Sequence, residues 1–351
     1  MTRGTRYFLA GSAFVAILGL GTGLVAYYNG GLPGVSRGSE ADLAFLPAGA
    51  AAVGFADVRA IMNSEFRQKL RQVLPTGEEL NHFKTELGVD IEHDIDTVAA
   101  AYLGGPTPFS GAVVIVRGRF NDVNIETIAT QHGAVAEQYK NVRVLTFTHP
   151  VAAASVADTP LQPGEQIVDA DVKAHPVPAV AFLQPGVLAL GESDAVKKAI
   201  DAGESGEDLR KNTELKSLID EVRGTGNAWF VGRTDMLAQH SGMPQEVVDH
   251  LPAVSLFAAS VHVNGGLSGA LRAEARDSKS AEQLRDVIRG ALAAGKLVSG
   301  DNPKMDAMLS SLQITGSGNS VGLTFAVPPE LLDLLNGLAA AHHLNDAPVK
   351  K

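Results

Sequence analysis

A stretch of 22 residues near the N-terminus, residues 7–28, contains no charged side chain. As an α-helix it would be about 33 Å long, enough to cross a hydrocarbon core of about 30 Å. Arg3 and Arg6 precede the stretch, whereas the next basic residue after it is Arg37. Because the positive flank of an anchor stays in the cytoplasm, the sequence predicts a single-pass bacterial inner-membrane protein whose main domain is periplasmic.

The alternative for the same stretch is a cleaved signal peptide, which also has a basic flank and an apolar core. Such a core is usually about 7–15 residues long and ends at a small-x-small site. Here the run is longer and ends in the bulky Tyr27 and Tyr28, which favours an uncleaved anchor. Gly19 and Gly23 have the small-xxx-small spacing that lets membrane helices approach closely. This pair predicts helix–helix contact and a homodimer through the anchor, unless small residues are simply common in such anchors.

The rest of the chain is acidic and contains no cysteine. The 39 acidic and 29 basic residues give a formal net charge of −10, which argues against nucleic acid and anionic lipid surfaces as partners. The absence of cysteine excludes disulfides, thiol nucleophiles, Cys-ligated zinc and iron–sulfur clusters. We therefore expect an envelope domain whose stability comes from its hydrophobic core.

The chain divides into five segments by composition and by the spacing of its apolar residues. The Gly-, Ser- and Pro-rich stretch 31–42 is typical of a tether. Beyond it, the same alternation of strands, hairpins and helices occurs twice, and Ser110-Gly-Ala112 and Ser268-Gly-Ala270 stand at the same step of each copy. We expect an internal duplication, with these boundaries: anchor 1–30, tether 31–42, first α+β unit 43–205, second α+β unit 206–343 and C-terminal tail 344–351.

The predicted fold class is α+β, with a transmembrane helix followed by two similar units of antiparallel or mixed sheet and helices packed on the sheet faces. Whether the units form one sheet or two stays open. Expected strands are 50–56, 97–103, 110–118, 142–148 and 227–232, and expected hairpins are 177–191, 254–275 and 311–327. Expected helices are 57–73, 77–87, 122–132, 193–202, 213–223, 280–294, 301–312 and 328–342, with Ser193 and Ser280 as caps and Gly295 ending the sixth helix.

No catalytic, cofactor or metal residues are predicted. The segment 90–96 holds four carboxylates and a histidine and could attract calcium, but it lacks the spacing of a calcium loop. The alternative is that its carboxylates satisfy free backbone amides before the next strand. The sequence also contains no HExxH zinc motif, GxSxG elbow or SxxK pair. Trp229, the single tryptophan, is expected to be a core residue rather than a stacking platform for a ligand.

Four segments resemble a loose group of bacterial exported proteins that carry an N-terminal anchor and have no assigned activity. They are Leu46-Pro47-Ala48 and the stretches 88–98, 190–200 and 278–286. The resemblance implies an α+β architecture and an envelope location, and it implies no reaction.

Three functions are compatible with these features. The first is a non-catalytic interaction or binding module, a subunit of an assembly with other envelope proteins, attached to the inner membrane through residues 7–28. The second is a carrier of lipid or apolar solutes, which requires an apolar tunnel between the two units. The third is a hydrolase whose site is assembled from distant residues, which requires a deep pocket with converging polar groups and perturbed pKa values.

Overall fold

The computed structural model describes residues 40–67, 89–104, 111–147, 177–234, 254–299 and 309–327. The predicted anchor with Gly19 and Gly23 and the predicted helices 77–87 and 328–342 lie outside these residues. In the part of the chain that is described, no helix is long and apolar enough to cross a membrane.

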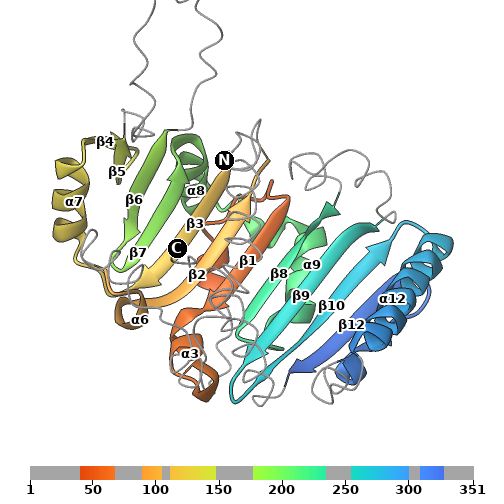
Figure 1. Cartoon of the computed structure of the whole chain (residues 1–351). Coiled ribbons are helices and arrows are strands. Elements are labelled where there is room, and N and C mark those ends of the chain that lie inside the picture. The colour runs from red at the N-terminus through yellow and green to blue at the C-terminus, as the bar shows by residue number, and fades with distance from the viewer. Residues whose placement is uncertain are drawn as a thin grey trace, which may run out of the picture.

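The described residues form a single twelve-stranded sheet in which every pairing is antiparallel, with helices on both faces (Figure 1). The order is β11-β12-β10-β9-β8-β1-β2-β3-β7-β6-β5-β4. This confirms the α+β class with a large antiparallel sheet, and it removes the mixed-sheet alternative for these strands. The question that the sequence left open is decided as well, because the two sets of strands form one continuous sheet.

The N-terminal half of the sheet starts at its middle and extends to one edge. Its seven strands are β1 (Ala52–Asp57), β2 (Ile95–Tyr102), β3 (Ala112–Gly118), β4 (Ala134–Tyr139), β5 (Val142–Phe147), β6 (Pro178–Gln184) and β7 (Val187–Glu192). Its helices are α2 (Glu40–Leu43), α3 (Val58–Met62), α6 (Ile91–Asp94), α7 (Asp122–Gln131) and α8 (Ser193–Ser205).

The C-terminal half starts beside β1 and extends to the other edge. Its five strands are β8 (Ala228–Arg233), β9 (Val254–Val263), β10 (Leu267–Ala275), β11 (Gln313–Thr315) and β12 (Ser320–Val327). A 3₁₀ turn, η1 (Leu209–Lys211), leads into α9 (Thr213–Val222), and α12 (Ser278–Ser299) follows β10. The β1–β8 pair lies between the two halves. On one side β2 and β3 follow β1, and on the other side β9 and β10 follow β8, so in each half these three strands are neighbours in the order of the chain.

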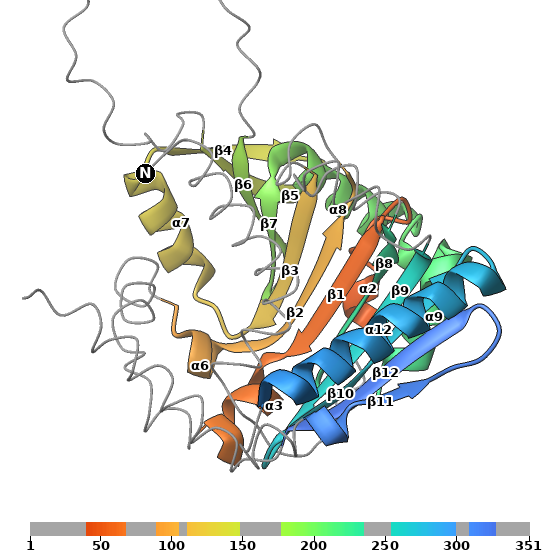
Figure 2. The ribbon, with the colours of Figure 1, turned by 45° about the vertical axis from the view of Figure 1, so that its right-hand side comes forward.

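The helices cover opposite faces of the sheet. Because successive side chains of a strand point to opposite faces, the strand residues that each helix contacts show which face it covers. Phe55 and Trp229 belong to the main core together with buried residues of α8 and α9, so these helices cover what we call the α8–α9 face. On the other side, α12 packs on Ala275 and Val321, and α7 packs on Leu145. Figures 1 and 2 show α12 in front of the sheet and α8 and α9 behind it. We call the second side the α7–α12 face.

Several predicted helix boundaries are wrong. The helix predicted over 57–73 is interrupted, because α3 ends at Met62 with Asn63 as its C-cap. Ser193 is the first residue of α8, and the capping position is Glu192, whose side chain makes no cap hydrogen bond. The helix predicted from Ser280 begins at Ser278, because the Asp277 carboxylate accepts the backbone N–H of Ser280 at 2.7 Å. Gly295 does not end this helix. It lies inside α12, where an added Cβ would stand 3.3 Å from Leu309, so the glycine accommodates close packing.

Strand β4 was not predicted. Its sequence, Ala-Val-Ala-Glu-Gln-Tyr, has no apolar run, and four of its six residues are exposed. It is an edge strand, joined to β5 by a tight turn in which Lys140 has a φ of 52°. An edge strand needs to bury few side chains, so its sequence carries a weak strand signal.

Candidate interaction surface

The junction of the two halves is filled by aromatic and aliphatic side chains. β1 and β8 pair directly, with Phe55 opposite Trp229. The two rings stack with centroids 5.7 Å apart, and each residue is 2% exposed. Trp229 is thus a core residue, as expected. Within the described residues this junction holds a packed core where the carrier hypothesis requires a tunnel.

The carboxylates of segment 90–96 bind protein groups. The Asp90 side chain accepts the backbone N–H of Glu92 at 3.0 Å, and the Asp94 side chain accepts that of Asp90 at 2.8 Å. The other two form ion pairs, Glu92 with Arg67 and Asp96 with Arg59. No three His, Asp or Glu side chains among the described residues are grouped to hold a metal ion. The segment thus matches the structural alternative, in which carboxylates satisfy the backbone around α6.

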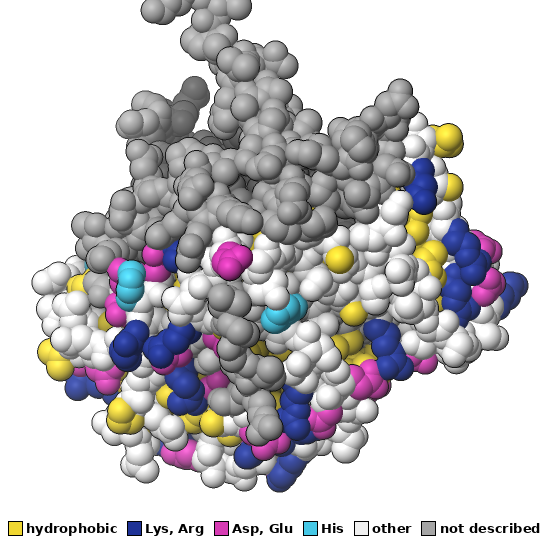
Figure 3. Space-filling model, turned by 90° about the horizontal axis from the view of Figure 1, so that it is seen from below, with side chains coloured by type: hydrophobic (Ala, Val, Ile, Leu, Met, Phe, Trp, Pro, Cys, Tyr) yellow, Lys and Arg dark blue, Asp and Glu magenta, His cyan; other side chains and the backbone are white. Residues whose placement is uncertain are grey.

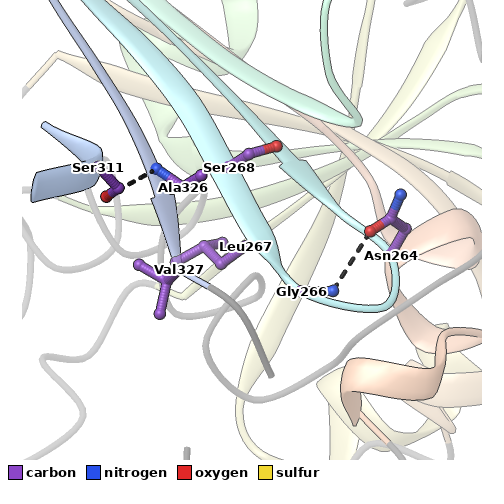
Figure 4. Close-up of a pocket in the computed structure, with 7 residues that line it drawn as sticks. All are labelled: Asn264, Gly266, Leu267, Ser268, Ser311, Ala326 and Val327. Carbon is purple, nitrogen blue, oxygen red and sulfur yellow. Dashed lines mark hydrogen bonds between the residues drawn. The ribbon is translucent and has the colours of Figure 1, made fainter. Parts of the chain in front are cut away.

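The best-formed pocket of the described residues is shallow and mostly apolar. It has a volume of about 340 Å³ and lies beside the β9–β10 turn and the end of β12 (Figure 4). Leu267 and Val327 supply its apolar side, and Asn264 and Ser311 supply polar groups. No ionisable side chain lines it, so it offers no support for the hydrolase hypothesis.

The groups with displaced pKa values lie elsewhere and have structural roles. Burial raises the pKa of Asp208, but hydrogen bonds from the Arg210 side chain and backbone more than offset this, and the pKa lies below its ordinary value. This carboxylate is buried and holds η1 beside Pro47. Hydrogen bonds to Asp201 and Glu204 raise the pKa of Lys140 and connect the β4–β5 turn to α8.

Helix α12 is attached to the sheet mainly through its N-terminal part. Ala281, Leu284 and Ile288 pack against Ala275 and Val321. The buried Arg285 also holds the helix on the sheet. Its guanidinium donates to the carbonyl oxygens of Gly318 and Ser320, both at 2.9 Å, and to Glu282 at 2.8 Å. The first three turns of α12 are thereby held against β10 and the β11–β12 hairpin.

Beyond this attachment, large apolar side chains face solvent. Val287 is 61% exposed and Leu297 is 85% exposed on α12, and Leu271 on β10 is 46% exposed. We call these three residues the α12 surface. Leu271 lies opposite Ala259 and Leu323, which places it on the α7–α12 face beside the helix. Figure 2 shows α12 running across this face in front of β10 and β12.

The exposure of Val287 was not expected from the sequence. Val287 belongs to an apolar stripe with Leu284, Ile288, Ala291 and Leu292. The stripe is wider than the contact that α12 makes with the sheet, so Leu284 and Ile288 pack while Val287 and Ala291 are exposed. The residues three and four positions from Val287, which adjoin it on the helix surface, are Gln283, Leu284, Gly290 and Ala291, so no flanking charge marked it as exposed.

The opposite half of the molecule has as many exposed apolar residues, but all of them are valines. Val123 on α7 is 74% exposed, Val135 on β4 is 52% exposed and Val177 beside β6 is 39% exposed, and no leucine is among the strongly exposed residues of the described N-terminal half. Charged side chains occur around both flanks in the view of Figure 3. The C-terminal half therefore has the larger exposed apolar side chains, next to the shallow pocket.

Comparisons with known proteins place few limits on these observations. No family model matches the chain, and neither does any curated protein sequence. Among solved structures, the chain is similar to crystal form I of TP0453, with a TM-score of 0.45 and 10% identity, covering 86% of this chain and 97% of that chain. A similarity of this degree carries no argument about function. The resemblance to anchored exported proteins thus stays a prediction from the sequence.

Proposed function

We propose that this protein is a membrane-anchored, periplasmic interaction module that acts without catalysis as a subunit of an envelope assembly. The single observation that carries the proposal is the α12 surface. Isolated exposed apolar residues are ordinary on a monomer, but large ones on one helix and its neighbouring strand are the kind of feature that marks an interaction site. The residues 7–28 supply the attachment to the inner membrane in this proposal.

The arrangement of the sheet supports this choice of surface. The α8–α9 face is closed by two amphipathic helices whose apolar residues belong to the main core. On the α7–α12 face, α12 packs on the sheet with its first turns, and Gly295 near its end packs against Leu309. Leu297 lies on another side of those later turns and is exposed, so it is available to a partner without any loss of the core.

The partner that fits is a second envelope protein with an apolar groove or helix. The exposed side chains Val287 and Leu297 are separated by ten residues on a straight helix, so they are about 15 Å apart along its axis. Asp286 and Arg289 pair with each other on another side of the helix and would lie outside the apolar contact. Carrier and hydrolase functions have no comparable support from the described residues.

Site-specific crosslinking in intact cells tests the proposal. A photoreactive residue would replace Val287 in the full chain, and the matched control would replace Val123, a valine on the other flank that is at least as exposed. We expect a defined crosslinked product from position 287, none from position 123, and loss of the product when Leu297 is changed to Asp or when the anchor is deleted. Equal labelling at both positions, or labelling insensitive to Leu297→Asp, would refute this interaction surface.

The membrane attachment is tested separately. We expect the full chain to sediment with inner membranes and to resist carbonate extraction, and we expect its folded part to be digested by protease only after the outer membrane is opened. A chain shortened at its N-terminus, or recovered in the soluble fraction, would contradict the anchor without affecting the α12 surface.

A further inference from the structure

The turn between β9 and β10 carries a chemical constellation that the interaction proposal does not use. It consists of Asn264, Gly265 and Gly266, with His262 at the end of β9. Asn264 lines the shallow pocket, and Figure 4 shows its side chain turned back over the loop toward Gly266. From this geometry we propose that Asn264 is a self-modification site, at which its own side-chain amide is converted to aspartate or isoaspartate with release of ammonia.

The first step is attack by the backbone nitrogen of Gly265 on Cγ of Asn264. The nitrogen gives its proton to solvent and forms a new bond to Cγ, while the carbonyl electrons move onto Oδ1. Glycine at this position removes steric hindrance to the attack. Around Gly265, an added Cβ would meet a single heavy atom within 4 Å, Oε2 of Glu65 at 3.6 Å, so the residue is not closely packed on that side.

Two neighbouring groups assist this step. The backbone N–H of Gly266 donates to Oδ1 of Asn264 at 3.2 Å, so it is placed to stabilise the negative charge that develops on that oxygen. Nε2 of His262 lies 3.1 Å from Nδ2 of Asn264. Because the amide Nδ2 only donates, Nε2 is the acceptor in this contact. Once the attack has made the leaving nitrogen tetrahedral, that nitrogen carries a lone pair, and a proton taken up on Nε2 can be passed to it.

In the second step the Cγ–Nδ2 bond breaks. The leaving nitrogen keeps the bonding pair, takes up a proton and departs as ammonia, which leaves a cyclic succinimide between Asn264 and Gly265. Water then opens the ring at either carbonyl and gives aspartate or isoaspartate. The sum is the addition of one water and the loss of one ammonia, so no oxidant, reductant or cofactor is required.

The modification would alter a contact between distant parts of the chain. The carbonyl oxygen of Asn264 accepts the backbone N–H of Phe66 at 3.0 Å, and Phe66 packs against Val263 in a small buried cluster. A new carboxylate would stand near Glu65, and isoaspartate would add a methylene group to the main chain at the turn. Both changes would weaken the attachment of residues 64–67 to the sheet.

The test is a time course on the purified full chain at neutral pH, with peptide mass spectrometry to measure the mass gain and chromatography to separate the isoaspartyl product. The chain contains an internal reference of identical sequence, Asn29-Gly30-Gly31. Wild type is compared with His262→Gln, which keeps a polar side chain but cannot donate a proton as imidazolium, and with Gly265→Ala, which hinders the attack.

We expect conversion of Asn264 in wild type and at least about a tenfold slower conversion in His262→Gln. A well-placed acid or base typically contributes about 10²–10⁴-fold, so a tenfold loss is a modest requirement. Asn29 should convert at one rate in all three proteins. Gly265→Ala should suppress conversion at Asn264 alone, and Trp229 fluorescence should show that both variants are folded. An unconverted Asn264 after Asn29 has reacted, or a wild-type rate in either variant, would overturn the proposal.

Discussion

The two halves of the sheet use their helices differently. In the N-terminal half, α8 is held to the edge strands along its length: Lys197 pairs with Glu137 of β4, and Lys140 pairs with Asp201 and Glu204. In the C-terminal half, α12 packs on the sheet with its first turns and on Leu309 through Gly295, and it leaves Val287 and Leu297 in solvent. A helix tied down by ion pairs contributes to stability, whereas one that keeps large apolar side chains exposed also presents a surface.

Each half also fixes one helix with a buried charged side chain. Asp42 of α2 accepts hydrogen bonds from Arg117 at 2.8 Å and from Thr97 at 3.0 Å. Arg285 of α12 donates to carbonyl groups of the β11–β12 turn. A buried charge is tolerated when it is paired and hydrogen-bonded, and in both cases its partners lie far away in sequence. Such contacts determine where each helix lies on the sheet.

The largest expected effect is at the junction of the halves. Changing Phe55 to Ala removes the ring stacked on Trp229, and we expect the free energy of unfolding to fall by about 3–5 kcal/mol, as for other buried aromatic residues. Urea unfolding followed by Trp229 fluorescence measures this directly, since the chain has one tryptophan. Phe55→Leu should cost less. If Phe55→Ala unfolds with the wild-type midpoint, the halves are not coupled through this pair.

The two buried charges should have the next largest effects. Arg285→Ala leaves two carbonyl groups of the β11–β12 turn without their donor, and Asp42→Ala leaves Arg117 without its carboxylate. Loss of hydrogen bonds to a charged group costs about 1.5–3 kcal/mol, and we expect each variant in this range by chemical denaturation. Asp220→Ala is the control, because the exposed pair of Asp220 with Lys216 should contribute below about 0.5 kcal/mol.

A smaller effect is expected at Asp208, which joins the halves through η1. Its carboxylate accepts the Arg210 backbone N–H at 2.9 Å, and loss of such a cap costs about 1 kcal/mol. Because its pKa is lower in the folded protein than its ordinary value of 3.8, its contribution is complete above that value and disappears as the pH falls below it. Unfolding midpoints measured in that acid range should converge for wild type and Asp208→Asn. A constant difference down to the lowest pH would contradict this assignment.

The smallest effect on stability is expected at the exposed valines. Val287→Asp and Val123→Asp should each change the free energy of unfolding by less than about 0.5 kcal/mol, the usual range for surface positions. They should differ in interaction: the change on α12 should abolish partner capture, and the change on α7 should leave it intact. Thermal unfolding and in-cell crosslinking of the same pair of variants would separate the two roles. A large loss of stability in Val287→Asp would mean that this residue belongs to the fold.

The success of the sequence predictions depended on local signals. The turns at Pro185-Gly186 and Asn264-Gly265-Gly266 were placed correctly, because apolar runs flank residues that favour turns. Helix α9 begins where its sequence predicts, and the Asn212 side chain caps it by accepting the Leu215 N–H at 3.1 Å. By contrast, Ser193 and Ser280 are not the capping residues. Glu192, the last residue of β7, precedes α8, and the Asp277 side chain accepts the Ser280 N–H in the first turn of α12. Strand β4 was missed because its few buried residues produce no pattern.

The candidate surface was predictable to a smaller degree than the fold. The apolar stripe of α12 shows that the helix packs on something, but a stripe does not reveal how wide the opposing surface is. That width depends on β10 and β12, and on Arg285 reaching the turn at Gly318. The exposure of Val287 and Leu297 is therefore a property of the assembled sheet.

The sequence by itself determined the α+β class, most hairpins and the absence of cysteine chemistry, because these depend on residue type and short-range periodicity. It also predicts the anchor at 7–28 and the duplicated units, which the described residues do not test. Only the tertiary structure decided that all described strands join one antiparallel sheet, that Phe55 stacks on Trp229 at its centre, and that α12 leaves Val287 and Leu297 exposed. Contacts between β1 and β8 link residues far apart in the chain, and local periodicity cannot specify which strands pair.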